Sequence, residues 1–337
     1  MRCSLRADRA LRALILALML LFDNAPSFPA ALRETDMGKI SLASLTLPEN
    51  RFLTLTREGK PITIWGELSF PAKGSALFPA VVLAHGCGGL GPTVREWAKQ
   101  LSLMGAASFA LDSFGGRGIR ETCTGQSRIN RGSRINDVYR ALELLSTHPR
   151  IDPSRIALMG FSQGGGIALL ARHLRFQRLW MTAERDFAAY LAFYPATCNR
   201  IFLQESEVSS RPLRIFQGTA DDWTPIGPCR EYVKRMRAAG KDVEIFEYPG
   251  AHHSFDNPSL PAARFRPEVL NGSNCSYVEG EPGRFQVLHR ETGKPSSSEN
   301  SCRRRGVTIG HHPTAYKRAI EDVRTFLRRI FRISQGQ

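Results

Sequence analysis

The sequence lacks several features that define common classes of protein. None of its seven cysteines forms a C-x-x-C pair, so we expect no structural zinc site. Its apolar run at residues 13–22 is too short to cross a bilayer comfortably. It contains no internal repeat and no zinc-finger or RNA-recognition signature. These absences predict a globular chain that has no resident metal or cofactor and binds no nucleic acid.

Acidic residues are scarce beside basic ones. The 46 lysines and arginines outnumber 31 aspartates and glutamates, which gives a formal net charge of +15. The arginines are dispersed along the chain, so a basic surface with weak electrostatic association with an anionic envelope explains the charge better than a nucleic-acid site. A hydrophobic content of 42% and a length of 337 residues are ordinary for a globular protein with a sizeable core.

The first residues have the pattern of a targeting segment. Four arginines precede the apolar run, and Ala25-Pro26-Ser27 offers small residues for cleavage. Residues 1–27 are therefore predicted to be a signal peptide that sends the chain to the periplasm or outside the cell. An uncleaved N-terminal membrane anchor is the alternative.

Export changes how the cysteines are interpreted. Six cysteines follow the predicted signal peptide, and an even number in an oxidising compartment favours disulfides. Six cysteines allow fifteen pairings, among which we favour Cys275–Cys302, then Cys87–Cys123, then Cys198–Cys229.

Short apolar runs alternate with amphipathic patterns over most of the chain. Buried strands are predicted at 79–84, 107–111, 156–159, 188–194, 213–217 and 243–248, with helices between them at 93–104, 135–145 and 229–239. Residues 52–56 and 62–70 alternate apolar and polar side chains and are predicted to pair at a sheet edge. This alternation indicates an α/β fold with a mostly parallel central sheet and helices on both faces.

The segments outside this alternation have other characters. Residues 28–50 are predicted to be a loosely ordered lead-in, and residues 51–255 the α/β core. Periodicity fades in residues 256–313, where Pro, Gly, Ser and Arg dominate, so we expect an irregular insertion joined by Cys275 and Cys302. Residues 314–332 are amphipathic and predict a closing helix of the core.

The sequence Gly160-Phe161-Ser162-Gln163-Gly164 stands between a predicted strand and a predicted helix. This is the pattern of a nucleophile elbow, in which a strained turn lifts the serine hydroxyl above the sheet edge. The flanking glycines leave room for that turn. Ser162 is therefore the candidate nucleophile.

Partners for Ser162 follow at the ends of later strands. Asp221 lies after the strand at 213–217 and His253 after the strand at 243–248. The chain order Ser, Asp, His is the order of α/β-hydrolase triads. The imidazole would take the serine proton and the carboxylate would orient the imidazole. Asp221 is preferred over its neighbour Asp222, and His253 over His252.

Other residues are expected to complete the site. His85-Gly86-Cys87-Gly88-Gly89 follows a central strand, where backbone N–H groups can approach a ligand closely. The N–H groups of Cys87 and Gln163 are the candidate oxyanion donors. Arg117 and Phe161 are candidate substrate contacts, although a solvated basic loop is the better explanation of Arg117.

Four motifs in register give the chain a resemblance to a known family. They are His85-Gly86-Cys87-Gly88-Gly89, Gly160-Phe161-Ser162-Gln163-Gly164-Gly165, Gly218-Thr219-Ala220-Asp221 and residues 248–255 (YPGAHHSF). The chain resembles the dienelactone hydrolase family of α/β-hydrolases over roughly residues 50–255 and the closing helix. The resemblance implies a cofactor-free hydrolase of small-molecule carboxylic esters or lactones, and it supports His253 as the catalytic histidine.

The chain departs from that family in two respects. Founding members use a cysteine nucleophile in the cytosol, whereas this chain has Ser162 and a predicted export signal. Two other functions are open at this point. One is an acyl- or dipeptidyl-type serine peptidase, because the same triad cleaves amides, and the other is a non-catalytic envelope-binding protein on the same fold.

Overall fold

A computed structural model describes residues 31–48, 57–72, 77–181, 184–296 and 299–333. The predicted signal peptide at 1–27 and the predicted strand at 52–56 lie outside the described residues. Within the part that is described, no helix is long and apolar enough to cross a membrane.

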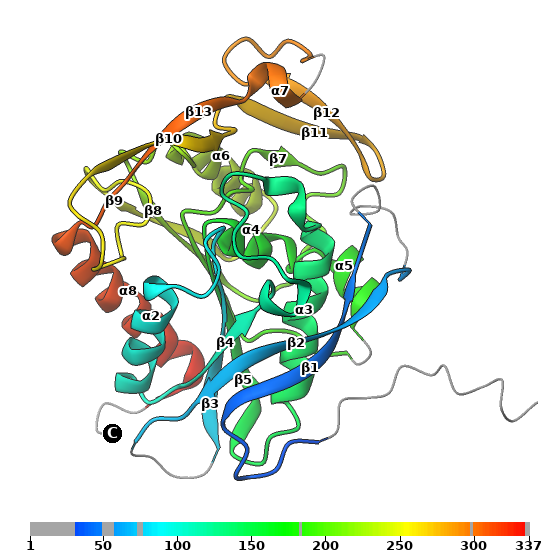
Figure 1. The fold of residues 1–337 in the computed structure, drawn as a ribbon, viewed down its shortest axis with the longest axis vertical. Helices are drawn as coiled ribbons and strands as arrows, with labels where there is room; N and C mark the ends of the chain where they lie inside the picture. The colour runs from blue at the N-terminus through cyan, green and yellow to red at the C-terminus, as the bar shows by residue number, and fades with distance from the viewer. Residues whose placement is uncertain (1–30, 49–56, 73–76, 182–183, 297–298, 334–337) are drawn as a thin grey trace, which may run out of the picture. The chain divides into compact units, whose positions relative to one another are not determined.

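A sheet of eight strands forms the centre of the fold (Figure 1). Its spatial order is β1-β2-β4-β3-β5-β6-β8-β9. The first two strands pair antiparallel with their neighbours, and the strands from β4 to β9 run parallel. The strands are β1 (Gly38–Thr46), β2 (Lys60–Ser69), β3 (Phe78–Ala84), β4 (Ala107–Asp112), β5 (Ile151–Phe161), β6 (Tyr190–Phe193), β8 (Leu213–Gly218) and β9 (Val243–Tyr248).

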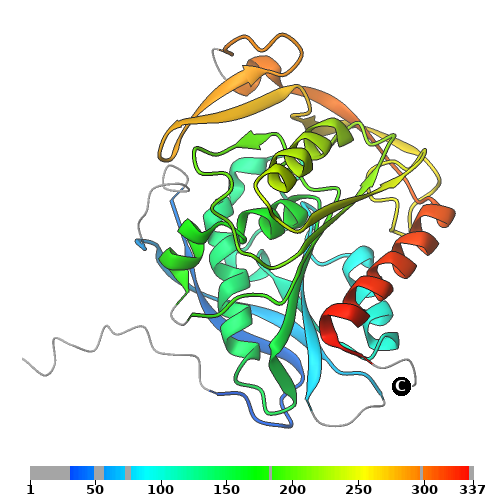
Figure 2. The ribbon, with the colours of Figure 1, turned by 180° about the vertical axis from the view of Figure 1, so that it is seen from behind.

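Helices cover both faces of this sheet, as Figures 1 and 2 show from opposite sides. One face packs against α3 (Arg131–Leu145), α4 (Gln163–Leu170), α5 (Leu174–Trp180) and α6 (Ile226–Ala238). The other packs against α2 (Pro92–Leu103) and α8 (Pro313–Phe331). Strands such as β3 and β4 are buried along their whole length because both of their faces are covered. The predicted α/β class with a mostly parallel sheet is confirmed.

Two segments are more regular than the sequence predicted. The lead-in at 28–50 contains β1, which pairs with β2 over nine residues. The insertion at 256–313 contains β10 (Arg264–Asn271), β11 (Cys275–Glu281), β12 (Arg284–His289), α7 (Glu299–Cys302) and β13 (Arg304–Ile309). Strand β10 pairs with β13, and β11 pairs with β12 and with β7 (Arg200–Ile201). Four of the eight residues of β10 are exposed, so its sequence shows little of the apolar pattern that predicts a strand.

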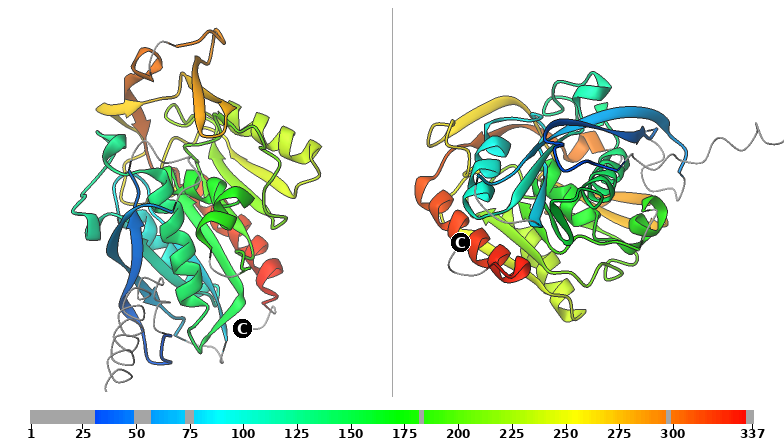
Figure 3. Two further views of the ribbon diagram at one scale, coloured as in Figure 1. Left: turned by 90° about the vertical axis from the view of Figure 1, so that its right-hand side faces the viewer. Right: turned by 90° about the horizontal axis from the view of Figure 1, so that it is seen from below.

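The described insertion lies at the end of the central sheet where the parallel strands terminate (Figure 3). All three predicted disulfides are present. Cys87–Cys123 joins the loop after β3 to the loop before α3, Cys198–Cys229 joins the segment after β6 to α6, and Cys275–Cys302 joins β11 to α7. The third of these bonds holds the insertion together internally.

Candidate active site

Ser162 occupies a strained turn between β5 and α4. Its φ of 54° and ψ of −112° lie in a region that side chains rarely adopt. The flanking glycines are sterically required. A Cβ at Gly160 would lie 2.0 Å from the Gly164 carbonyl oxygen, and one at Gly164 would lie 2.0 Å from that of Ala84. The elbow therefore depends on close backbone approach at both glycines.

A continuous hydrogen-bonded chain runs from Ser162 to Asp221. The Nε2 atom of His253 lies 3.0 Å from the Ser162 hydroxyl, and its Nδ1 atom lies 2.8 Å from Asp221 Oδ2. All three side chains are buried or nearly so. The three residues follow β5, β8 and β9, whose carboxyl ends meet at one edge of the sheet. This geometry is the one required for an imidazole to accept the serine proton.

The carboxylate of Asp221 is held rigidly. The backbone N–H groups of Trp223 and Thr224 each donate to Oδ1 at 2.9 Å. Oδ2 accepts from the Thr224 hydroxyl at 2.8 Å and from the Gln217 amide at 3.1 Å, in addition to its contact with His253. Four donors besides the imidazole therefore fix the position of this carboxylate.

The two competing neighbours point elsewhere. Asp222 accepts hydrogen bonds from the N–H and hydroxyl of Thr308 in β13, at 2.8 and 2.9 Å. His252 contacts the Ala220 carbonyl through Nδ1 at 3.0 Å. The structure thus brings Asp221 and His253 to Ser162, and it uses Asp222 to attach the insertion.

The candidate oxyanion donors flank Ser162. Gln163 is the first residue of α4, where N–H groups have no carbonyl partner within the helix. The loop with Cys87 approaches from β3, since a Cβ on Gly86 would lie 3.4 Å from Ser162 Cβ. Cys87 and Ser162 line the same cavity.

His85 fixes the peptide unit that precedes Cys87. Its Nε2 accepts from the Ser113 N–H at 3.3 Å, so the proton resides on Nδ1, which donates to the Gly86 carbonyl at 2.7 Å. A trans peptide places its N–H opposite its carbonyl, so this bond also sets the direction of the Cys87 N–H. Burial, reinforced by the Arg134 charge, lowers the pKa of His85 to about 3, so the ring is neutral at physiological pH.

A cavity of about 240 Å³ opens at the triad. The core contributes Phe161, Tyr194 and Trp223. The ring centres of Tyr194 and Trp223 lie 4.5 and 4.7 Å from the ring centre of His253. The insertion contributes another part of the wall, namely Asn257, Leu260, Arg266, Val269 and Ile309. Gly310 in turn donates its N–H to the His253 carbonyl at 3.0 Å. The insertion is therefore part of the site.

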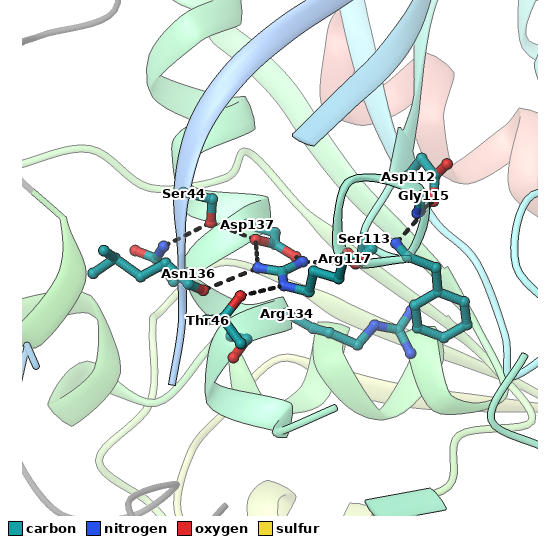
Figure 4. Close-up of polar contacts among 12 residues, drawn as sticks. Ser44, Thr46, Asp112, Ser113, Gly115, Arg117, Arg134, Asn136 and Asp137 are labelled. Atoms are coloured by element: carbon teal, nitrogen blue, oxygen red, sulfur yellow. Dashed lines mark hydrogen bonds and ion pairs between the residues drawn. The ribbon is translucent and has the colours of Figure 1, made fainter. Parts of the chain in front are cut away.

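The two predicted substrate contacts differ in outcome. Phe161 lines the cavity, although it is 2% exposed and packs mainly against Phe193. The structure contradicts the prediction for Arg117, whose side chain is 3% exposed. Its guanidinium forms an ion pair with Asp137 and donates to Thr46 and Ser113 (Figure 4). It also donates to the Leu45 carbonyl. These five hydrogen bonds use every donor of the side chain, so none is left for a substrate.

Sequence reasoning missed several residues that surround the site. Thr122 and Arg134 contact both Gln163 and the loop of Cys87, and Trp223, Val269 and Ile309 line the cavity. Thr122 stands next to Cys123, whose predicted bond to Cys87 was a usable signal. Among the described residues, no group of three or more His, Cys, Asp or Glu side chains is arranged to hold a metal ion.

Comparison with known proteins gives concordant results. The sequence model of the dienelactone hydrolase family matches residues 68–279. The uncharacterized peptidase YuxL of Bacillus subtilis (strain 168) is 20% identical over 251 residues, which are 66% of this chain and 38% of that protein. A probable 2-oxo-3-(5-oxofuran-2-ylidene)propanoate lactonase of a Bradyrhizobium species is 23% identical over 185 residues, which are 52% of this chain and 73% of that protein.

Solved structures share the fold. A dienelactone hydrolase-like promiscuous phosphotriesterase from metagenomic libraries superposes with a TM-score of 0.53 at 18% identity, over 87% of this chain and 99% of that one. At that identity the similarity establishes the α/β-hydrolase architecture and leaves substrate open.

Proposed function

Because the chain belongs to the dienelactone hydrolase family, with a match over more than half of its length, we propose that it is a serine hydrolase of carboxylic esters or lactones. The observation that carries the proposal is the hydrogen-bonded chain Ser162–His253–Asp221 beside an accessible cavity. Family membership supports the reaction class, and the site geometry supports the roles of individual residues.

In the first half-reaction, Ser162 Oγ attacks the substrate carbonyl while His253 Nε2, 3.0 Å away, takes its proton. Asp221 at Nδ1 holds the imidazole in the productive tautomer and stabilises the imidazolium. The N–H groups of Cys87 and Gln163 donate to the oxygen of the tetrahedral intermediate. His253 then protonates the leaving alcohol, and an acyl-enzyme remains on Ser162.

In the second half-reaction, water replaces the leaving alcohol. His253 takes a proton from water, the resulting hydroxide attacks the acyl carbonyl, and the same oxyanion donors stabilise the second intermediate. Collapse returns the proton to Ser162 and releases the acid. For a lactone substrate, acid and alcohol leave as one hydroxy acid.

We also propose that this reaction takes place outside the cytosol. Three disulfides fit an oxidising compartment, and the basic composition would favour weak association with an anionic envelope. Three cysteine pairs that were reduced in the native protein, measured by thiol titration and peptide mapping, would contradict this part of the proposal.

The test is labelling with a fluorophosphonate, followed by intact-mass measurement. The wild type should gain a single adduct and Ser162→Ala none. With p-nitrophenyl butyrate as substrate, Ser162→Ala and His253→Ala should each lose activity by about 10⁶-fold. Turnover of a panel of peptide anilides distinguishes an esterase from a peptidase, because a peptidase should hydrolyse these amides faster than the ester. A folded wild type that forms no adduct and turns over neither class would favour the binding-protein alternative.

A further inference from the structure

The two candidate oxyanion donors belong to different segments of the chain. Cys87 follows β3 and Gln163 follows β5, and these strands are paired only as far as Ala84 and Gly160. Beyond that point the sheet no longer fixes the distance between the two N–H groups. Two buried side chains, Arg134 and Thr122, bridge the gap.

Arg134 extends from α3 to both loops. Its NH2 group donates to the carbonyl of His85 in the first loop, and its NH1 group donates to the side-chain oxygen of Gln163 at 3.2 Å. The side chain is buried, with 3% of the residue exposed, and its guanidinium lies 5.2 Å from the centre of the Phe114 ring. A planar fork can reach two acceptors with two nitrogens, which a single ammonium cannot do.

Thr122 makes the same connection from the other side. Its N–H donates to the Cys87 carbonyl at 2.8 Å, and its hydroxyl donates to Gln163 Oε1 at 2.9 Å. The neighbouring Cys123 is bonded to Cys87. Gln163 Oε1 therefore accepts from both bridging residues, and each bridging residue is also bonded to the loop of Cys87.

We propose that Arg134 and Thr122 are positioning residues that set the separation and direction of the Cys87 and Gln163 N–H groups, and so preorganise the oxyanion hole. This inference rests on the proposed hydrolase function. It also assigns a role to the side chain of Gln163, which serves as the common acceptor.

The electrostatic environment of Arg134 fits this role. Its two bonds go to neutral carbonyl oxygens, while the nearby carboxylate of Asp137 is paired with Arg117 (Figure 4). Burial lowers the pKa of Arg134 to about 10, which still leaves it charged at neutral pH. A fixed buried positive charge behind the oxyanion donors stabilises negative charge that develops in the transition state.

The test compares the rate constant for fluorophosphonate labelling of Ser162 in matched variants. Arg134→Lys keeps the charge but loses the fork, and Thr122→Val keeps the shape but loses the hydroxyl. Misplacement of a donor by about 1 Å costs roughly 100-fold in rate, so we expect a drop of about that size for Arg134→Lys and about tenfold for Thr122→Val. Thr122→Ser should recover most of the wild-type rate. With p-nitrophenyl butyrate, kcat per labelled site should fall while KM stays within about twofold.

Arg172→Lys is the control for general destabilisation. Arg172 is also buried and donates to the backbone carbonyls of Ser209 and Arg211, but it contacts neither the loop of Cys87 nor Gln163. The labelling rate constant and the kcat per labelled site of Arg172→Lys should both equal those of the wild type. If Arg134→Lys does not fold, the proposal is tested by Thr122→Val and Thr122→Ser alone, of which only the first should slow labelling.

The outcomes separate this inference from the proposed function. A wild type that is labelled and active, with folded Arg134→Lys and Thr122→Val variants that react at the wild-type rate, would overturn the positioning role and leave the hydrolase intact. A folded wild type that is never labelled at Ser162 would overturn both.

Discussion

At the scale of single residues, two adjacent carboxylates divide the work of the site. Asp221 accepts from His253, and Asp222 accepts twice from Thr308 in the insertion. The backbone N–H groups of Trp223 and Thr224 fold back onto Asp221 and turn the two side chains in different directions. One turn therefore positions the imidazole of His253 and attaches the insertion.

This division predicts opposite effects of two similar substitutions. Asp221→Asn should lower kcat by about 10⁴-fold, because the amide cannot stabilise the imidazolium and favours the wrong tautomer. Asp222→Asn should keep kcat within about tenfold and lower thermal stability, because it weakens only the link to Thr308. Steady-state kinetics and a thermal melt of both variants check this. An inactive Asp222→Asn beside an active Asp221→Asn would reverse the assignment.

The residues that we propose as the triad could be located from sequence because each stands at a fixed place relative to a strand end. Choosing Asp221 over Asp222 and His253 over His252 was harder, since adjacent side chains share the same motif. The structure separates them by their partners, Thr308 for Asp222 and Ala220 for His252. Arg117 was wrongly assigned because sequence shows a basic loop but does not show a buried partner such as Asp137.

At the scale of elements, the ribbon of β10 and β13 is the part that most distinguishes the site from its α/β scaffold. Trp223 donates from its indole N–H to the Leu270 carbonyl at 3.1 Å, and Ile309 forms a bridge with His253. Val269 of β10 and Val307 and Ile309 of β13 form a small buried apolar cluster within the ribbon. The ribbon thus joins the loops of both Asp221 and His253 and supplies one wall of the cavity.

We expect this wall to determine which acyl groups fit. Val269→Ala enlarges the cavity, so the ratio of kcat/KM for p-nitrophenyl hexanoate to kcat/KM for p-nitrophenyl acetate should rise several-fold. A change of that size is what one or two methylene groups contribute to selectivity in an apolar pocket. Val307→Ala is the matched control, because Val307 is buried in the same cluster but does not line the cavity. Equal selectivity in the two variants would show that the ribbon acts only as a cover.

Sequence patterns located the central strands and the helices that cover them because burial on both faces gives long apolar runs and strong helical periodicity. The same reasoning failed for β10 to β13, because β10 exposes half of its residues and β12 buries none, so few buried apolar side chains mark these strands. It also left β1 in a lead-in described as loose. An edge strand is stabilised mainly by its pairing with the neighbouring strand, so its own sequence need not show the apolar pattern that predicts a strand.

At the scale of the whole molecule, the described chain buries several ionisable groups that no substrate would contact. Two are histidines at separate places in the core, His85 beside the oxyanion loop and His173 between α4 and α5. His173 packs against Phe202, with ring centres 4.5 Å apart, and no described partner bonds to its Nδ1 atom. A neutral imidazole is tolerated in such a place, whereas a charged one would lose its hydration.

These buried histidines predict that stability falls in mild acid. Burial lowers the pKa of His85 and of His173 to about 3, with Arg134 and Arg175 respectively reinforcing the effect. An unfolded histidine titrates near 6.5, so between about pH 6.5 and 3 the unfolded state binds a proton that the folded state does not. The free energy of unfolding therefore decreases as pH falls through this range, and the loss levels off below about pH 3.

Each histidine should reduce the free energy of unfolding by about 2 kcal/mol between pH 7.5 and pH 5. His173→Phe removes one of the two without removing a hydrogen bond to its Nδ1 atom, so the variant should lose about 2 kcal/mol less than the wild type over the same interval. Urea unfolding at pH 7.5 and pH 5, with the disulfides intact, measures the loss of unfolding free energy in each protein. The contributions of all other titrating groups cancel when the two losses are subtracted. Equal losses in the two proteins would mean that His173 has the same pKa in the folded and unfolded states, so that its burial against Phe176 and Phe202 does not lower it.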